Sequence, residues 1–173
     1  MSAPVVVNGW TIFSHPLFLD QLTVLAAKVE SLRDKNPDGY KAKNPTKRLA
    51  AIVKLAFETI PQDPTRAEYR QGSTLGDEYK HWFRAKFFQQ YRLFFRYHQD
   101  HKIIVYGWVN DEETKRAYDS KSDAYRVFAK MLANGSPPND WDALLKHAKN
   151  AEVTNVERAV GLVNEPSTDD VDG

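Results

Sequence analysis

Apolar residues in the first third of the chain recur at helical spacing. Steps of three and four residues join Phe18, Leu22, Leu25, Val29 and Leu32, and a second stripe consists of Leu49, Ile52, Val53, Ala56 and Ile60. This spacing places each set on one face of a helix. The segments NPDGY at 36–40 and IPQDP at 60–64 end the stripes, because proline and glycine interrupt helices. The pattern therefore predicts two helices joined by a short turn, an αα-hairpin.

Capping signals predict where these helices start. Ser14 is the expected N-cap of the first helix, and Pro16 is tolerated in its first turn. Asn44-Pro45 is expected to start the second helix. Residues 5–13, ahead of both, favour a short first strand or an extended arm.

The middle of the chain has the character of a sheet. Residues 68–72 suggest a short strand, and 72–78 a turn-rich loop. The segment IIVYGW at 103–108 is continuously apolar and rich in β-branched and aromatic residues. Such a run is typical of a central strand covered on both faces. HQDHK at 98–102 is the predicted hairpin turn before it.

Helices are expected again after the sheet. Asn110 or Asp111 is the N-cap candidate for a helix in NDEETKRAYD, and Ser122 for a helix over 123–133. Asn134-Gly135 is expected to stop that helix. Asp140 is the candidate cap of a last helix that ends at His147. The expected order of elements is that of an α+β fold.

Length and composition limit the class of protein. The 173 residues suit one domain, which we place at 1–150, and the acidic segment 151–173 predicts a disordered tail. This tail could mask a basic cleft, but an inert solvated tail is the favoured interpretation. The chain has no cysteine, which excludes disulfides and thiolate chemistry. No long apolar run and no signal peptide are apparent, so we expect a cytoplasmic protein without membrane contact.

The formal net charge is only +1, so any basic surface must be local. Such a surface is predicted by HWFRAKFFQQYRLFFRYH at 81–98, which contains no acidic residue. The length of the turn at Gln89-Gln90 decides which residues of the two strands share a face of the sheet. A two-residue loop would mix cations and aromatics on both faces. We predict a three-residue loop, although the turn has no glycine, because burial favours the sorted register.

In that register the cations and aromatics separate. One face carries Arg84, Lys86, Arg92, Arg96 and His98, and the other carries Phe83, Ala85, Phe87, Leu93, Phe95 and Tyr97. We expect the apolar face to lie under the helices and the basic face to be concave and open. Single-stranded RNA is held by cations and aromatics of this kind. The alternative is a solvated hairpin whose long cations only cover apolar surface.

Several strings resemble the YhaV toxins of the RelE/ParE superfamily of type II toxin–antitoxin systems. These strings are YRLFFRY, GWVNDEETKRAY, DAYRVFAKML and GSPPNDW, with VNGW, SHP and TKRLAA nearer the N-terminus. The resemblance covers roughly residues 7–146. It implies a RelE-like αα-hairpin on a small twisted antiparallel sheet, with C-terminal helices. It also implies an endoribonuclease that cleaves mRNA, free or on the ribosome, and thereby inhibits translation.

The resemblance also implies partners and site residues. The partner would be a PrlF-type antitoxin, and operator DNA would be bound and repressed only through the antitoxin complex. The implied catalytic residues are Arg84, Lys86, Arg92, Tyr118 and Tyr125. The expected RNA-binding residues are Lys80, Arg96, His98, Arg116 and Lys121.

Each catalytic candidate suits a role in attack by a 2′-hydroxyl. Arg84 and Arg92 would stabilise the phosphorane, because arginine is always charged and binds phosphate through two N–H groups. Lys86 would be the base, with a pKa lowered by neighbouring arginines, and His98 is the rival base. Tyr118 and Tyr125 are candidate acids or stacking platforms, or simple packing residues.

No cofactor or metal is expected. The remaining histidines lack ligand spacing such as HExxH, and the acidic 111–113 suits a helix start better than a magnesium site. Three other functions remain open: an RNA-binding module that does not cut, a ParE-like poison of DNA gyrase, and an inactive protein that only binds its antitoxin.

Overall fold

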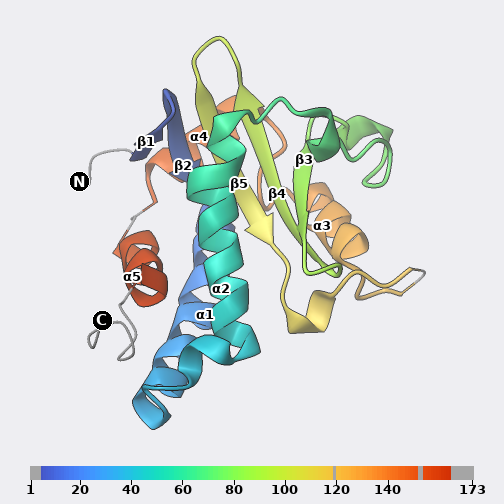
Figure 1. Cartoon of the computed structure of the whole chain (residues 1–173). Helices are drawn as coiled ribbons and strands as arrows, with labels where there is room; N and C mark the ends of the chain where they lie inside the picture. Colours follow the sequence, from blue (N-terminus) through green and yellow to red (C-terminus); the bar gives the residue numbers. More distant parts are fainter. Residues whose placement is uncertain (1–4, 119, 152–153, 165–173) are drawn as a thin grey trace.

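A five-stranded sheet forms the centre of the fold, in the order β1-β2-β5-β4-β3 (Figure 1). The computed structural model describes residues 5–118, 120–151 and 154–164. The strands are β1 (Val5–Val7), β2 (Trp10–Ser14), β3 (Phe83–Phe87), β4 (Tyr91–His98) and β5 (Ile103–Val109). The helices are α1 (Pro16–Lys35), α2 (Asn44–Lys54), α3 (Ala124–Ala133), α4 (Trp141–Lys149) and α5 (Thr154–Asn164). The α+β class is therefore confirmed.

The sheet is mixed, not antiparallel as predicted. Strand β2 pairs with β5 in parallel, whereas the other three pairings are antiparallel. The predicted single strand over 5–13 is in fact the hairpin β1–β2. Asn8 and Gly9 form its two-residue loop with φ angles of 50° and 82°, which is the conformation that an Asn-Gly hairpin loop favours.

The αα-hairpin of α1 and α2 is present as predicted. Helix α2 continues through a π-helical turn, Leu55–Thr59, and a 3-10 turn, Ile60–Gln62. The first cap differs from the prediction: His15, not Ser14, caps α1, and its Nδ1 accepts a hydrogen bond from the backbone N–H of Leu17 at 3.1 Å. Ser14 belongs to β2 and is buried, so its backbone is committed to the sheet.

Other predicted elements also shift. Asp123, not Ser122, caps α3. Asp111 does cap a helix, but that helix is a single 3-10 turn, Glu112–Thr114. Residues 68–72 contain part of the 3-10 turn Ala67–Tyr69 and a single bridge from Arg70 to Phe83 in place of a strand. Asp140 caps α4 as predicted, and α4 ends at Lys149.

Two apolar cores lie on the two faces of the sheet. The first joins Leu93, Phe95 and Tyr106 to the αα-hairpin. The second joins Phe94, Val105 and Trp108 to α3 and α4. In Figure 1, α2 crosses in front of the strands and α4 lies behind them.

The predicted open, concave basic face is therefore wrong. The face that carries Arg84, Arg92 and Arg96 also carries Phe94, which is fully buried against Phe128 of α3. An aromatic residue in the middle of this face has to be covered, because leaving it in water is costly. Helices α3 and α4 provide the cover, so only part of the basic face reaches solvent.

The prediction of a disordered tail is wrong for the helix α5. Val156, Ala159 and Leu162 are buried in the core under α1 and α2. Arg158 forms an ion pair with Glu30 of α1. The apolar spacing of these three residues explains the packing, since steps of three residues share a helix face. The predicted tail from 165 onwards lies outside the described residues.

Candidate active site

The turn between β3 and β4 sets the register of the basic residues. Phe87 pairs with Tyr91 and Lys86 with Arg92, so the loop has three residues, as predicted. Arg84, Lys86 and Arg92 therefore share one face of the hairpin. Phe88 and Gln89 adopt positive φ angles of 46° and 61° in place of the glycine that the turn lacks. Left-handed backbone at such residues is strained by about 1–3 kcal/mol each.

The phenol of Tyr125 joins two of these arginines. Its Oη accepts a hydrogen bond from Nε of Arg84 at 3.0 Å and from Nε of Arg92 at 3.1 Å. Arg84 also donates from Nη1 to the carbonyl of Glu68 at 2.6 Å. Arg92 is only 6% exposed and donates from Nη1 to the carbonyls of Gln89 and Tyr91. Within the described part of the chain these hydrogen bonds use Nε and Nη1 of each arginine.

Arg116 adds a third guanidinium group. Its guanidinium carbon lies 4.7 Å from the ring centre of Tyr125 and 3.9 Å from that of Tyr118. Its Nη1 donates to Oδ1 of Asp123 at 2.6 Å. Tyr118 is 81% exposed, so its ring is held on the arginine at the surface. Arg84, Arg92, Arg116 and Tyr125 are hereafter the guanidinium cluster.

Asp123 is the acidic partner of this cluster. Burial raises the pKa of its carboxyl, but hydrogen bonds from Arg116 and from the backbone of Ala117 and Tyr125 outweigh burial and lower the pKa overall. The carboxylate therefore remains charged at neutral pH with both oxygens engaged. Three guanidinium groups against one carboxylate leave the cluster positively charged.

A buried amide holds the cluster in place. Asn110 is 2% exposed and accepts a hydrogen bond from the backbone N–H of Arg92 at 2.7 Å. Its Nδ2 donates to the carbonyls of Gln90 and Thr114. The backbone N–H of Arg116 also donates to Gln90. These bonds attach the 110–116 segment to the β3–β4 turn, which is why that segment is not the predicted helix.

Sequence reasoning treated Asn110 and Asp123 only as parts of helix starts. The available signal was position: Asn110 follows a strand that is buried along almost its whole length. A polar residue at such a point needs a hydrogen-bonded role.

Sequence comparison relates this chain to known toxins. A family model described as a toxin with endonuclease activity, of a toxin–antitoxin system, matches residues 12–149. The chain is 44% identical over 151 residues to the ribonuclease toxin YhaV of Escherichia coli K12. The aligned residues make up 86% of this chain and 98% of the relative. The toxin YhaV of Escherichia coli O157:H7 matches to the same extent. No solved structure matches.

This chain belongs to the YhaV family of endonuclease toxins. The resemblance in its sequence strings is thereby confirmed. Family membership also brings an antitoxin partner, because the family is one of toxin–antitoxin systems.

The other predicted residues lie on several different elements of the fold. Lys86 is exposed and pairs directly across from Arg92. Lys121 is exposed in the loop before α3. Lys80 is exposed and forms an ion pair with Asp77 at 3.5 Å. Of these three, Lys86 alone stands on the strands that carry the cluster.

Arg96 and His98 form part of a second group around α4. Arg96 donates to the carbonyl of Asn139 at 2.7 Å and lies over the rings of Trp82 and Trp141. Burial lowers its pKa to about 10, against an opposing effect of Asp140. His98 lies beside Trp141 and stacks on His101. These two residues contact different partners from those of Arg84 and Arg92.

Across the described ranges, no group of three or more His, Cys, Asp or Glu residues could hold a metal ion. No helix in those ranges is long and apolar enough to cross a membrane.

Proposed function

We propose that this member of an endoribonuclease toxin family cleaves single-stranded mRNA without a metal ion, by attack of a 2′-hydroxyl on the adjacent phosphorus. The observation that carries the proposal is the guanidinium cluster, in which the phenol of Tyr125 binds Nε of both Arg84 and Arg92. Fixed cations aimed at one point can stabilise the charge that develops on a phosphorane.

The three arginines supply this stabilisation. Arg84 and Arg92 are held by two or more hydrogen bonds each, and Arg116 is held by Asp123. These hydrogen bonds hold the guanidinium groups in place before any substrate binds, and such preorganisation is what makes electrostatic stabilisation effective. Arginine can also bind two phosphate oxygens at once.

Lys86 and Tyr125 carry the protons. Lys86 takes the proton of the 2′-hydroxyl as the O2′–P bond forms. The P–O5′ bond breaks, and Tyr125 gives its proton to the leaving 5′-oxygen. The Nε–H groups of Arg84 and Arg92 both donate to the phenol oxygen of Tyr125, so its own O–H is left to donate. Lys86 is favoured over His98, because His98 lies beside Trp141 on the other side of Arg96 along β4.

Three further proposals concern the wider system. We propose that the arrangement is RelE-like, that the antitoxin is of the PrlF type, and that the toxin–antitoxin complex represses its own operon. The αα-hairpin packed on the antiparallel strands β3, β4 and β5 supports the first point. The substrate, mRNA, makes the cytoplasm the place of action.

One assay tests the function. Purified protein and its Arg84→Ala variant receive a long mRNA in EDTA, with and without ribosomes, and the fragments are mapped. We expect cuts by the wild type that are absent from the variant, and the ribosome lanes show what presents the substrate. Cleavage that needs added Mg²⁺ contradicts metal independence. Retained RNA binding without any cleavage favours a binding module, and gyrase inhibition is then the next activity to measure.

A further inference from the structure

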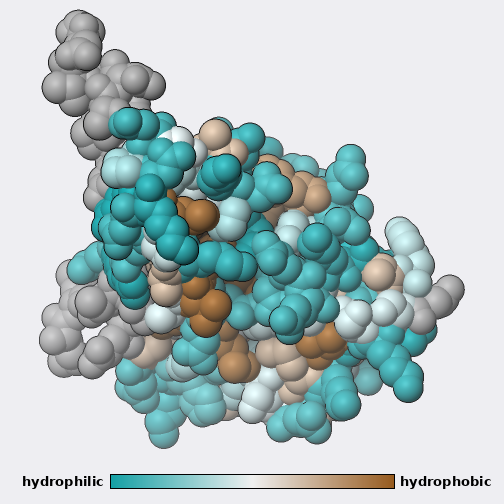
Figure 2. Space-filling model, turned by 90° about the horizontal axis from the view of Figure 1, so that it is seen from below, coloured by the Kyte–Doolittle hydropathy of each residue, from teal (hydrophilic) through white to brown (hydrophobic). Residues whose placement is uncertain are grey.

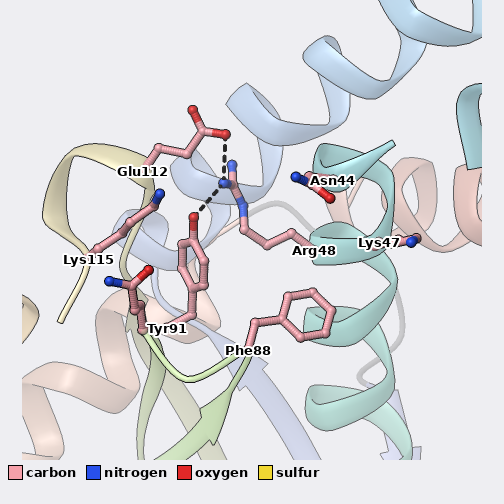
Figure 3. A pocket seen from close by; sticks show the side chains of 8 residues that line it. Asn44, Lys47, Arg48, Phe88, Tyr91, Glu112 and Lys115 are labelled. Atoms are coloured by element: carbon pink, nitrogen blue, oxygen red, sulfur yellow. Dashed lines mark hydrogen bonds and ion pairs between the residues drawn. The ribbon is translucent and has the colours of Figure 1, made fainter. Parts of the chain in front are cut away.

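A basic pocket lies on the side of the β3–β4 turn opposite to the guanidinium cluster (Figure 3). Its volume is about 350 Å³, within the range of small-molecule sites. The walls come from α2, from the turn and from the segment after Asp111, with Lys47, Arg48, Phe88, Tyr91, Glu112 and Lys115 among the lining residues. The turn and the Glu112–Thr114 helix lie at the lower end of the sheet in Figure 1. Figure 2 views the molecule from that end, and shows a mostly hydrophilic surface with smaller apolar areas.

Phe88 is the unusual feature of this pocket. Its side chain is 54% exposed, and its backbone holds a φ angle of 46°. A large aromatic residue in left-handed backbone is strained, and a glycine would form the same turn without strain. The ring of Phe88 meets that of Phe87 at a centroid distance of 5.7 Å, yet more than half of its side chain is exposed. A strained and exposed aromatic ring in the lining of a pocket points to a ligand.

The charges of the pocket are unequal. Arg48 is buried and donates to Oη of Tyr91 at 3.1 Å, and it lies 3.2 Å from a carboxylate oxygen of Glu112. Glu112 is also paired with Lys28 outside the pocket. Lys47 and Lys115 are exposed, and neither forms an ion pair with another described residue. Two cations therefore remain for an anionic ligand.

The pocket and the guanidinium cluster share the β3–β4 turn and the segment 115–116, from opposite sides. Arg92 donates to the carbonyl of Gln89 in the same turn. Lys115 and Arg116 are consecutive, and Lys115 has the extended backbone angles φ −59° and ψ 150°. Neighbouring side chains in extended backbone point to opposite sides. Lys115 accordingly lines the pocket, whereas Arg116 stands in the cluster.

We propose that this pocket binds one unpaired nucleotide of the RNA substrate, beside the nucleotides at the cleaved phosphate. The base stacks on Phe88, and Lys47 and Lys115 hold its phosphate. The side-chain amides of Asn44 and Gln90, which also line the pocket, meet the edge of the base. An aromatic ring combined with backbone-binding cations is the usual means of holding single-stranded RNA. The inference rests on the proposed ribonuclease function and adds a subsite to it.

Binding of fluorescent 2′-O-methyl RNA oligonucleotides, which cannot react through their 2′ position, tests the subsite. Phe88→Gly removes the ring but suits the turn, so its melting temperature is expected to equal or exceed that of the wild type. We expect it to weaken binding on the order of tenfold, the usual loss for one stacked base. Lys47→Ala and Lys115→Ala are each expected to lower the salt dependence of binding by about 0.7 in the log–log slope. Lys54→Ala, on the same helix outside the pocket, is the matched control and is expected to bind like the wild type.

Cleavage of an unmodified mRNA by the same variants tests the nucleotide subsite separately from the ribonuclease function. A loss of preference for the bases that flank the cuts in Phe88→Gly supports the subsite. Wild-type binding, cleavage and flanking preference in all three pocket variants would overturn it, while leaving the ribonuclease intact. Loss of antitoxin binding alone would also overturn it, by making the pocket a protein interface. A wild type that neither binds nor cuts RNA removes the proposed function and the subsite together.

Discussion

Tyr125 of α3 and Arg92 of β4 are joined by a hydrogen bond of 3.1 Å between Oη and Nε. The same phenol accepts from Arg84 of β3 at 3.0 Å. One side chain from a C-terminal helix thus fixes two guanidinium groups on neighbouring strands. The helix that covers the sheet is therefore also part of the candidate active site.

Tyr125→Phe removes the phenol oxygen but keeps the ring under Arg116. We expect the cleavage rate to fall by about 10²-fold or more, because a proton donor and the anchor of two arginines are lost together. RNA affinity should change little, since the three cations remain. The measurement is kcat and KM with a short RNA. Tyr97→Phe, on the opposite face of β4, is the control, and equal rates in the two variants would contradict the role of Tyr125.

Lys86→Arg keeps the positive charge of this position but replaces a possible base with a group that stays protonated. We expect RNA binding to stay within about twofold, and cleavage to fall about 10²-fold. Single-turnover cleavage and anisotropy titration measure the two quantities separately. Cleavage at the wild-type rate would show that Lys86 acts only through its charge, and would leave the base unassigned.

His15 predicts a specific acid sensitivity. Burial, and then the nearby His147, lowers its pKa from 6.5 to about 4. Between these values the unfolded chain binds more protons than the folded one, so the free energy of unfolding falls as the pH falls from 6.5 towards 4. The loss from this residue is up to about 3 kcal/mol. Urea unfolding at several pH values measures it.

His15→Asn is the comparison for this effect, because asparagine can cap α1 but does not titrate. Its stability should be flatter over the same window. His81, whose pKa burial also lowers, contributes equally to both proteins. Identical pH profiles would mean that His15 is not a buried neutral histidine.

The helix α5 is expected to be a docked part of the fold. Leu162→Asp places a charge in the core under α1 and α2, so we expect α5 to detach and trypsin to cut after Arg158. RNA cleavage should be retained, because α5 lies on the face of the sheet opposite to Tyr125. Glu157→Ala, exposed on the same helix, should stay resistant. Equal resistance of the two variants would contradict the docking.

Patterns within short segments of the sequence predicted the elements that are determined by residues close together in the chain. The stripes of α1 and α2, the central strand β5 and the three-residue turn were all found, because burial selects one helix face and one strand register. The parallel pairing of β2 with β5 was missed, since it joins residues about 90 apart and leaves no local signal. The cover over Phe94 was missed for the same reason.

The residues of the candidate site were likewise predicted only in part. Arg84, Lys86, Arg92 and Tyr125 were named from the sequence, and the fold brings three of them into hydrogen-bonded contact. Arg96 and His98 lie on the same face of β4 as Arg92. In the fold, however, Arg96 donates a hydrogen bond to Asn139 and His98 lies beside the ring of Trp141. Periodicity identifies a face, but only the packing of α3 and α4 decides which of its residues meet. The supports Asn110 and Asp123 depend on contacts with the turn and with Arg116, and those contacts are tertiary.

The chemistry of the cut ends tests the central claim most directly. The wild type is incubated with a single-stranded RNA in EDTA, and the termini of the fragments are identified by mass spectrometry. Attack by the 2′-hydroxyl predicts a 2′,3′-cyclic phosphate, or its hydrolysis product, on one fragment and a free 5′-hydroxyl on the other. A 5′-phosphate with a 3′-hydroxyl would mean that water is the nucleophile, and would contradict the account built on Arg84, Arg92 and Tyr125.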